Sequence, residues 1–189
     1  MTERVEVRIE VRVDVTEVVT REDRALLRNL YPLYLHDLTA FTEFYDVDEA
    51  GVFFPDYLPD WLERRLSIMH PMIIRAGDRP AGFALVAEAP FPHMTPGRDY
   101  RMCEFFVLNR HRRRGVGRRA AHALFDRFRG LWEVTELPAN LAAVSFWRRV
   151  IGEHTGGAYV EAVERGDVVQ VFDSRRSPVT PTRPTPRRA

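Results

Sequence analysis

Residues 101–128 place an apolar strand pattern, a loop rich in arginine and glycine, and a helix pattern in direct succession. The loop holds five arginines and two glycines in the nine residues from His111 to Arg119. Apolar residues then recur at helical spacing, at positions 116, 120, 124 and 128, up to Gly130. A strand that leads into a helix through a glycine loop is typical of α/β proteins.

The chain before this segment begins with a strand pattern. From Val5 to Val15 every odd position is apolar and every even position is charged, which predicts a half-buried strand. A capping box of Thr20 and Asp23 opens a predicted helix over 21–44, bent near Pro32. In chain order we then expect a long loop over 40–61, a short helix over 59–66 and a hairpin over 72–89 that turns at Gly77 and Asp78.

The remaining patterns complete a mixed α/β order without repeats. They predict strands over 100–108 and 131–137, a helix over 139–152 that Gly152 closes, and two strands over 158–164 and 168–172. The segment 175–189 is rich in Pro and Arg and has few large apolar residues. We therefore expect one domain over 1–174 and a disordered tail over 175–189.

Composition excludes several classes of protein. The net charge of +1 is too small for a polyelectrolyte binder, so any basic surface is local. Cys103 is the single cysteine and forms no intramolecular disulfide, and the first residues lack the apolar core of a signal peptide. No apolar run reaches the roughly 18 residues of a membrane span, and the histidines show no metal-site spacing. We expect a soluble cytoplasmic protein without a metal site.

The arginine and glycine loop has the chemistry of a phosphate site. Free amides at a helix start attract anions, and arginines donate charged hydrogen bonds to phosphate oxygens. The alternative is that Gly115 and Gly117 only shape a turn and that the arginines are solvated. A Walker loop would need a lysine that the chain lacks, and a dinucleotide fingerprint would need a third glycine where Ala120 stands.

The loop instead resembles the signature of the GNAT acetyltransferases, in which a strand valine precedes Arg or Gln, two residues, Gly, one residue, and Gly or Ala. The matching residues are Val107, Arg112, Arg113, Arg114, Gly115, Val116 and Gly117. Downstream, ANLAAVSFW resembles the second cofactor element of that family, with Asn140 opening a helix. The resemblance implies a GNAT-like fold, with a mostly antiparallel twisted sheet, splayed fourth and fifth strands, and flanking helices.

The resemblance also implies an activity, in which acetyl-CoA donates an acetyl group directly to the primary amine of a small molecule or peptide. The resemblance implies that the signature residues, together with Arg118 and Asn140, contact acetyl-CoA. Trp147 stands where many family members have a tyrosine that protonates the departing thiolate, so the general acid is open, with water, Tyr100 or Tyr159 as alternatives. A second reading is therefore a non-catalytic acyl-CoA sensor or interaction module. The acyl chain length and the oligomeric state, a homodimer included, stay open.

Acetylation needs an uncharged amine, whereas a free alkyl amine has a pKa of about 10. Glu104 and Glu133 are the candidate bases, although either is also compatible with a paired structural charge. Residues 43–61 mix acidic and aromatic side chains, which favours a cationic acceptor or else an ordinary acidic loop. Nucleic acid and membrane partners are not expected, because the acids beside the arginines and the low net charge oppose a basic face.

Overall fold

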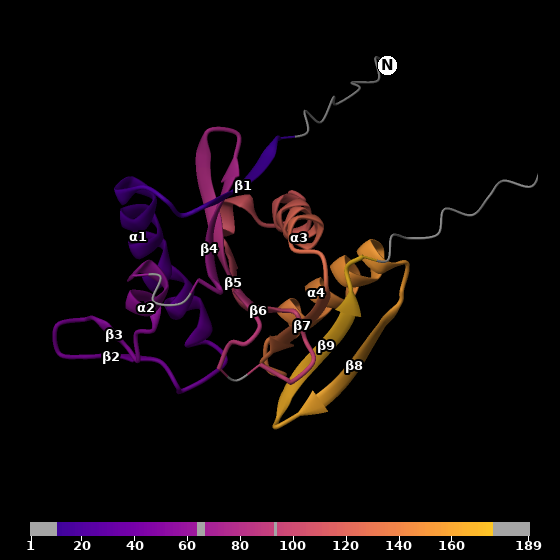
Figure 1. Ribbon diagram of the computed structural model, residues 1–189. Helices are drawn as coiled ribbons and strands as arrows, with labels where there is room; N and C mark the ends of the chain where they lie inside the picture. Colours follow the sequence, from indigo (N-terminus) through magenta and orange to yellow (C-terminus); the bar gives the residue numbers. More distant parts are fainter. Residues whose placement is uncertain (1–10, 64–66, 93, 176–189) are drawn as a thin grey trace, which may run out of the picture.

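The computed structural model describes residues 11–63, 67–92 and 94–175, and its centre is a seven-stranded sheet (Figure 1). In spatial order the strands are β1 (Val13–Glu17), β4 (Met69–Ala76), β5 (Arg79–Glu88), β6 (Tyr100–Val107), β7 (Leu131–Glu136), β9 (Asp167–Asp173) and β8 (Tyr159–Glu164). β6 and β7 are parallel, and the other neighbouring pairs are antiparallel. The predicted mixed α/β fold with a mostly antiparallel sheet is confirmed.

Helices cover both faces of the sheet. α1 (Arg21–Leu38) and α2 (Leu58–Glu63) lie on one face, and α3 (Val116–Arg127) and α4 (Leu141–Thr155) lie on the other (Figure 1). Alternation along β5 shows the two layers, because Phe83 and Leu85 pack under α1 whereas Ala84 and Val86 join the core under α3 and α4. The sheet is therefore the middle of three layers.

Two helix ends differ from the prediction. α1 starts at the predicted capping box and runs through Pro32, but it ends at Leu38, where the Thr39 hydroxyl donates to the carbonyl of His36 at 2.7 Å. α4 continues past Gly152 to Thr155, and the left-handed Gly156 (φ +64°) ends it. In both cases the apolar spacing predicted the helix correctly but placed its C-terminal end at the wrong residue.

The predicted loop over 40–61 contains a small hairpin of β2 (Asp46–Val47) and β3 (Phe53–Phe54), which projects from the body of the molecule (Figure 1). Strands of two residues are too short to show a period. Residues 5–10 of the first predicted strand, 64–66 of the short helix and 176–189 of the tail lie outside the described residues. None of the helices in the described ranges is long and apolar enough to cross a membrane.

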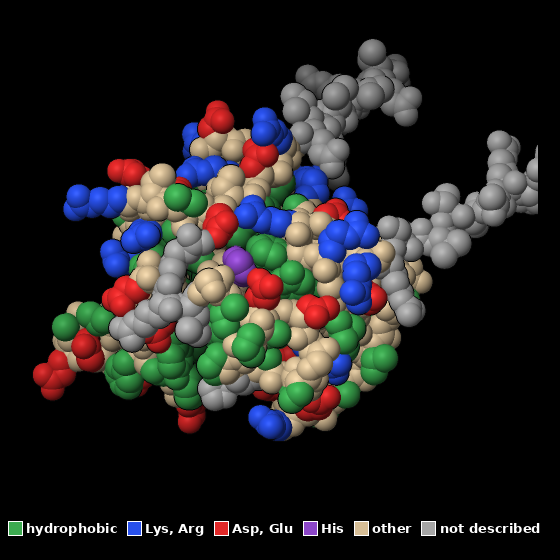
Figure 2. Space-filling model, in the orientation of Figure 1, with side chains coloured by type: hydrophobic (Ala, Val, Ile, Leu, Met, Phe, Trp, Pro, Cys, Tyr) green, Lys and Arg blue, Asp and Glu red, His purple; other side chains and the backbone are tan. Residues whose placement is uncertain are grey.

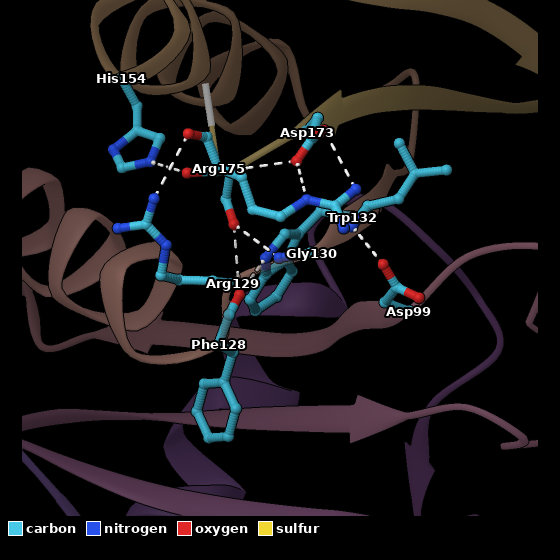
Figure 3. Close-up of polar contacts among 10 residues, drawn as sticks. Asp99, Phe128, Arg129, Gly130, Trp132, His154, Asp173 and Arg175 are labelled. Atoms are coloured by element: carbon cyan, nitrogen blue, oxygen red, sulfur yellow. Dashed lines mark hydrogen bonds and ion pairs between the residues drawn. The ribbon is translucent and has the colours of Figure 1, made fainter. Parts of the chain in front are cut away.

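The parallel pair of β6 and β7 is short. Its register runs from Tyr100 opposite Trp132 to Met102 opposite Val134, and within the described chain it extends no further. A polar network fastens the start of β7 (Figure 3): the amide of Leu131 donates to Asp99 at 2.7 Å, and the Trp132 indole N–H donates to the carbonyl of Phe128 at 2.8 Å. Beyond Met102 the two strands part.

A 3₁₀ turn, η1 (Asn109–His111), connects β6 to the arginine and glycine loop. The amide of His111 donates to the carbonyl of Leu108, and the amide of Arg112 donates to that of Asn109. The loop therefore begins directly at the end of β6, beside the part of the strand that has left β7.

Candidate active site

A pocket of about 330 Å³ opens where β6 and β7 part. From the α1 side it is lined by Tyr34, Leu38, Thr42, Tyr45, Cys103 and Glu104. From the α4 side it is lined by Phe105, Val134, Glu136, Asn140, Ala143 and Trp147. Because both layers contribute, the pocket lies in the gap of the sheet and is bordered from its two faces.

A one-residue bulge directs Glu104 into this pocket. β5 pairs Leu85 with Glu104 but Val86 with Met102, so Cys103 is the extra residue and Glu104 faces α1. There the hydroxyl of Tyr34 donates to Oε2 of Glu104. Burial raises the pKa of Glu104 to about 7, although the Tyr34 hydrogen bond and the charge of Arg101 both act to lower it. A carboxyl group with such a pKa is suited to accept a proton at neutral pH.

The second predicted base, Glu133, has a different environment. Its side chain is 1% exposed, lies 3.1 Å from Nη1 of Arg101 and accepts from the amide of Thr95 at 3.3 Å. It does not line the pocket. The structure thus brings only Glu104 of the two predicted bases to the pocket, and a catalytic role for Glu133 stays a prediction.

The predicted phosphate loop leads into α3 through two left-handed residues, Arg113 (φ +58°) and Gly115 (φ +74°). The amides of the first turn of α3 have no acceptor within the helix. A Cβ on Gly117 would lie 3.3 Å from the ring of Phe146 and 3.5 Å from a methyl of Val107, so glycine lets this helix start pack against α4 and β6. The loop can therefore present free amides to an anion on the α3 and α4 face.

The loop arginines are not equivalent. Arg112 donates through Nε to the carbonyl of Val107 at 2.7 Å and forms an ion pair with Asp37, so it ties the loop to β6 and α1. Arg119 folds back over Gly115 and donates to the carbonyl of Arg114 at 3.3 Å. The guanidinium groups of Arg113 and Arg114 are exposed and have no ion pair among the described residues. Both side chains could therefore donate to a phosphate.

Two further predicted residues border the pocket from α4. Asn140 caps the helix, with its Oδ1 accepting from the amide of Ala143 at 3.1 Å. Trp147 is 5% exposed and packs against Phe105 and Phe146. An indole N–H is no acid at neutral pH, and neither Tyr100 nor Tyr159 lines the pocket.

Glu136, at the end of β7, is a pocket residue that the sequence analysis missed. It is 6% exposed, and neither of its carboxyl oxygens has a hydrogen-bond partner among the described residues. Burial, followed by the charge of Glu161, raises its pKa to about 9. The available signal was a lone acid on the apolar face of a strand, after Trp132 and Val134, and no motif contains it.

The acidic and aromatic loop borders a second pocket of about 630 Å³, which shares Thr42 and Tyr45 with the first. Of the acids in the loop, Glu43 and Asp46 line this pocket. Asp48 accepts from the amides of Ala50 and Val52 and so stabilises the hairpin turn. Figure 2 shows acidic side chains among hydrophobic ones on this projecting part of the surface. No cluster of metal-ligating side chains is found in the described ranges.

Comparisons with known proteins agree with this geometry. Residues 28–152 match the family model "Acetyltransferase (GNAT) family". No curated protein matches the sequence. Among solved structures, an acetyltransferase from Thermus thermophilus is 17% identical with a TM-score of 0.59, over 87% of this chain and 98% of that one.

Two other similar structures have named substrates. The spermidine N-acetyltransferase from Vibrio cholerae, in complex with CoA and spermine, is 13% identical with a TM-score of 0.59, over 87% of this chain and 96% of that one. The ribosomal-protein-S18-alanine N-acetyltransferase from Escherichia coli is 12% identical with a TM-score of 0.51, over 92% and 100%. At these identities the structures establish the fold, and the family model covers well over half of the sequence. The chain belongs to the GNAT acetyltransferases, the acyltransferase family that uses acetyl-CoA.

Proposed function

We propose that the protein transfers an acetyl group from acetyl-CoA to the primary amine of a small molecule or peptide, with Glu104 as the general base. The observation that carries the proposal is the bulge in β6, which directs the partly buried carboxyl group of Glu104 into the gap between β6 and β7. Its pKa of about 7 lets it hold a proton or release one at neutral pH.

The chemistry requires proton transfers at the acceptor nitrogen and at the thiol sulfur. Glu104 removes a proton from the acceptor ammonium, and the neutral nitrogen attacks the acyl carbon. As the C–N bond forms and the C–S bond breaks, the nitrogen loses its second proton and the sulfur gains one. Backbone N–H groups along the free edge of β6 near Val107 would stabilise the oxyanion during this step.

The loop before α3 would hold the pyrophosphate of acetyl-CoA. The amides of residues 113–118 and the exposed guanidinium groups of Arg113 and Arg114 fit an anion there. Arg112 would hold the loop in place rather than bind the phosphate, because its guanidinium group contacts the carbonyl of Val107 and the carboxylate of Asp37. Asn140 would approach the pantetheine arm from the α4 side, because it lines the pocket there.

The acceptor would be cationic and enter from the α1 side. Glu43 and Asp46 line the second pocket, and Tyr45 lies at its junction with the first. Carboxylates beside aromatic faces favour ammonium groups. The spermine bound to the similar Vibrio cholerae enzyme supports this class of acceptor without identifying the one used here.

The test combines thiol release from acetyl-CoA, with a panel of mono- and polyamines, and calorimetric binding of CoA. Binding together with amine-dependent thiol release supports the enzyme, whereas binding without turnover supports the sensor reading that Trp147 suggests. Glu43→Gln with Asp46→Asn should raise the KM for cationic amines. Asp78→Asn, in the turn between β4 and β5, is the matched control. An unchanged KM for every amine would refute the cationic acceptor.

A further inference from the structure

We propose that Glu136 is the general acid of the reaction and protonates the thiolate sulfur as the C–S bond breaks. The proposal rests on the acetyl transfer proposed above, and it assigns the role that Trp147 cannot fill. The position of Glu136, its surroundings and its protonation all support this role.

The position of Glu136 is opposite that of Glu104. Trp132, Val134 and Glu136 follow the same face of β7, and the first two belong to the core under α3 and α4. Glu104 faces α1 from the other side of the gap, and both residues line the same pocket. Because the phosphate loop precedes α3, the acyl donor would enter on the face where Glu136 lies.

This arrangement matches the geometry of the reaction. An amine that attacks the acyl carbon from the α1 side expels the sulfur toward the α4 side. A base is needed where the nucleophile enters and an acid is needed where the leaving group departs. Glu104 and Glu136 occupy these two positions.

The surroundings leave the carboxyl group of Glu136 without a competing hydrogen-bond partner among the described residues. It is 6% exposed, and both of its carboxyl oxygens lack hydrogen-bond partners among the described residues. The nearby cation Arg148 is engaged by Glu161 of β8 through two hydrogen bonds of 2.8 and 2.6 Å. Gln170 of β9 also donates to Glu161, at 2.9 Å. A buried carboxyl group without a partner is costly, which is typical of a functional group rather than of a structural one.

The surroundings also keep Glu136 protonated. Burial raises its pKa most, the charges of Glu161 and Asp167 raise it further, and Arg148 opposes them, so that the pKa is about 9. A cysteine thiol has a pKa of about 8.5, so a thiol leaving group is of similar acidity to this carboxyl group. Two carboxyl groups in one pocket whose pKa values are separated by their environments are a recurrent acid and base pair.

The proton balance of the cycle is complete without another reactant. The acceptor nitrogen enters as an ammonium and loses two protons, one to Glu104 before the attack and one as the amide forms, which Glu104 accepts after it has passed the first to water. Glu136 gives one proton to sulfur as the bonding pair moves to it, and it takes one from water after product release. The net reaction is ammonium plus thioester to amide, thiol and one released proton.

The test uses Glu136→Gln in the full-length protein, with Glu164→Gln on exposed β8 as the matched control. Two donors are compared. The alkyl thiolate of acetyl pantetheine needs a proton to leave, whereas the aromatic thiolate of acetyl thiophenol leaves without protonation. Glu136→Gln should lower kcat/KM about 10²-fold or more with acetyl pantetheine and only a few-fold with acetyl thiophenol. Glu164→Gln should match the wild type with both donors.

A second readout does not depend on turnover. In protein with ¹³C-labelled glutamate carboxyl groups, a carboxyl should titrate near pH 9 in the wild type and in Glu164→Gln, and be missing in Glu136→Gln. If Glu136→Gln does not fold, Glu136→Asp keeps the acid and shortens its reach. It should retain a high-pKa carboxyl signal and still lose activity selectively with acetyl pantetheine.

The outcomes separate this inference from the proposed function. Equal losses with both donors, or no loss, would overturn the assignment of Glu136 while acetyl transfer by the wild type stands. A donor-selective loss in Tyr45→Phe instead would assign the acid to the α1 side and also overturn it. No thiol release by the wild type with any amine would refute the proposed function itself.

Discussion

The two ends of the β6 and β7 pair contrast sharply. At the closed end, Trp132 is fully buried, and its indole N–H donates to the carbonyl of Phe128 (Figure 3). At the open end, Glu104 and Glu136 are carboxyl groups with raised pKa values, and Glu136 has no hydrogen-bond partner among the described residues.

The contrast indicates that residues at the closed end mainly stabilise the sheet, whereas residues at the open end mainly serve the reaction. At the closed end, hydrogen bonds and aromatic packing fix the register of the strands. The open end holds buried polar groups that are costly to keep in the folded state, as is common at functional sites. Substitutions at the closed end should therefore change stability, and those at the open end should change activity.

The largest effect is expected from Trp132→Ala. Trp132 packs against Phe125 and Phe172, so the substitution leaves a cavity and removes the hydrogen bond to Phe128. We expect a loss of about 3–5 kcal/mol in the free energy of unfolding, measured by urea denaturation.

The same substitution at the open end is the control. Trp147 borders the pocket, where water can replace part of the ring, so Trp147→Ala should destabilise less. Equal losses for the two tryptophans would remove the proposed contrast between the two ends.

The second prediction concerns Glu104→Gln at the open end. Without the base, kcat should fall about 10²- to 10⁴-fold. Wild-type kcat at saturating amine should rise as the pH passes through about 7, because Glu104 must lose its proton to act, and this limb should disappear in the variant. A pH–rate profile of both proteins checks this, and an unchanged low-pH limb in Glu104→Gln would exclude the assignment.

Although Glu104→Gln should lose activity, it should not lose stability at alkaline pH. The folded-state pKa of Glu104 lies above its ordinary value of 4.5, so folding favours the protonated form. Its contribution to the free energy of unfolding is therefore complete below about pH 4.5 and is lost as the pH rises to about 7. Glu104→Gln removes this loss and should be at least as stable as the wild type at pH 8.

Most of the sheet could be predicted from the sequence, because strand and helix periods are local. The turn at Gly77 and Asp78, the capping box at Thr20 and the loop from Arg112 to Gly117 all appear where the patterns indicated. The helix termini at Leu38 and Thr155 were predicted incorrectly, since they depend on single capping interactions.

The site was less predictable, because its geometry depends on register. The bulge at Cys103 decides which face of the sheet Glu104 occupies, and only the pairing with β5 reveals it. Glu133 looked equivalent in sequence but pairs with Arg101, whereas Glu136 is left unpaired by the contact between Arg148 and Glu161. These are long-range relations that no local pattern contains.

The smallest effect is expected from Ser174→Ala at the closed end. The buried hydroxyl of Ser174 accepts from the amide of Gly130 at 3.0 Å and lies 3.3 Å from the carbonyl of Phe128, to which it donates. Removing it should cost about 1 kcal/mol of unfolding free energy and leave kcat unchanged, because the network fixes the start of β7 and does not reach the pocket. Ser174→Thr keeps a hydroxyl and should restore part of the loss. A fall in kcat without a change in stability would mean that the closed end also controls the chemistry, and the separation of the two ends would not hold.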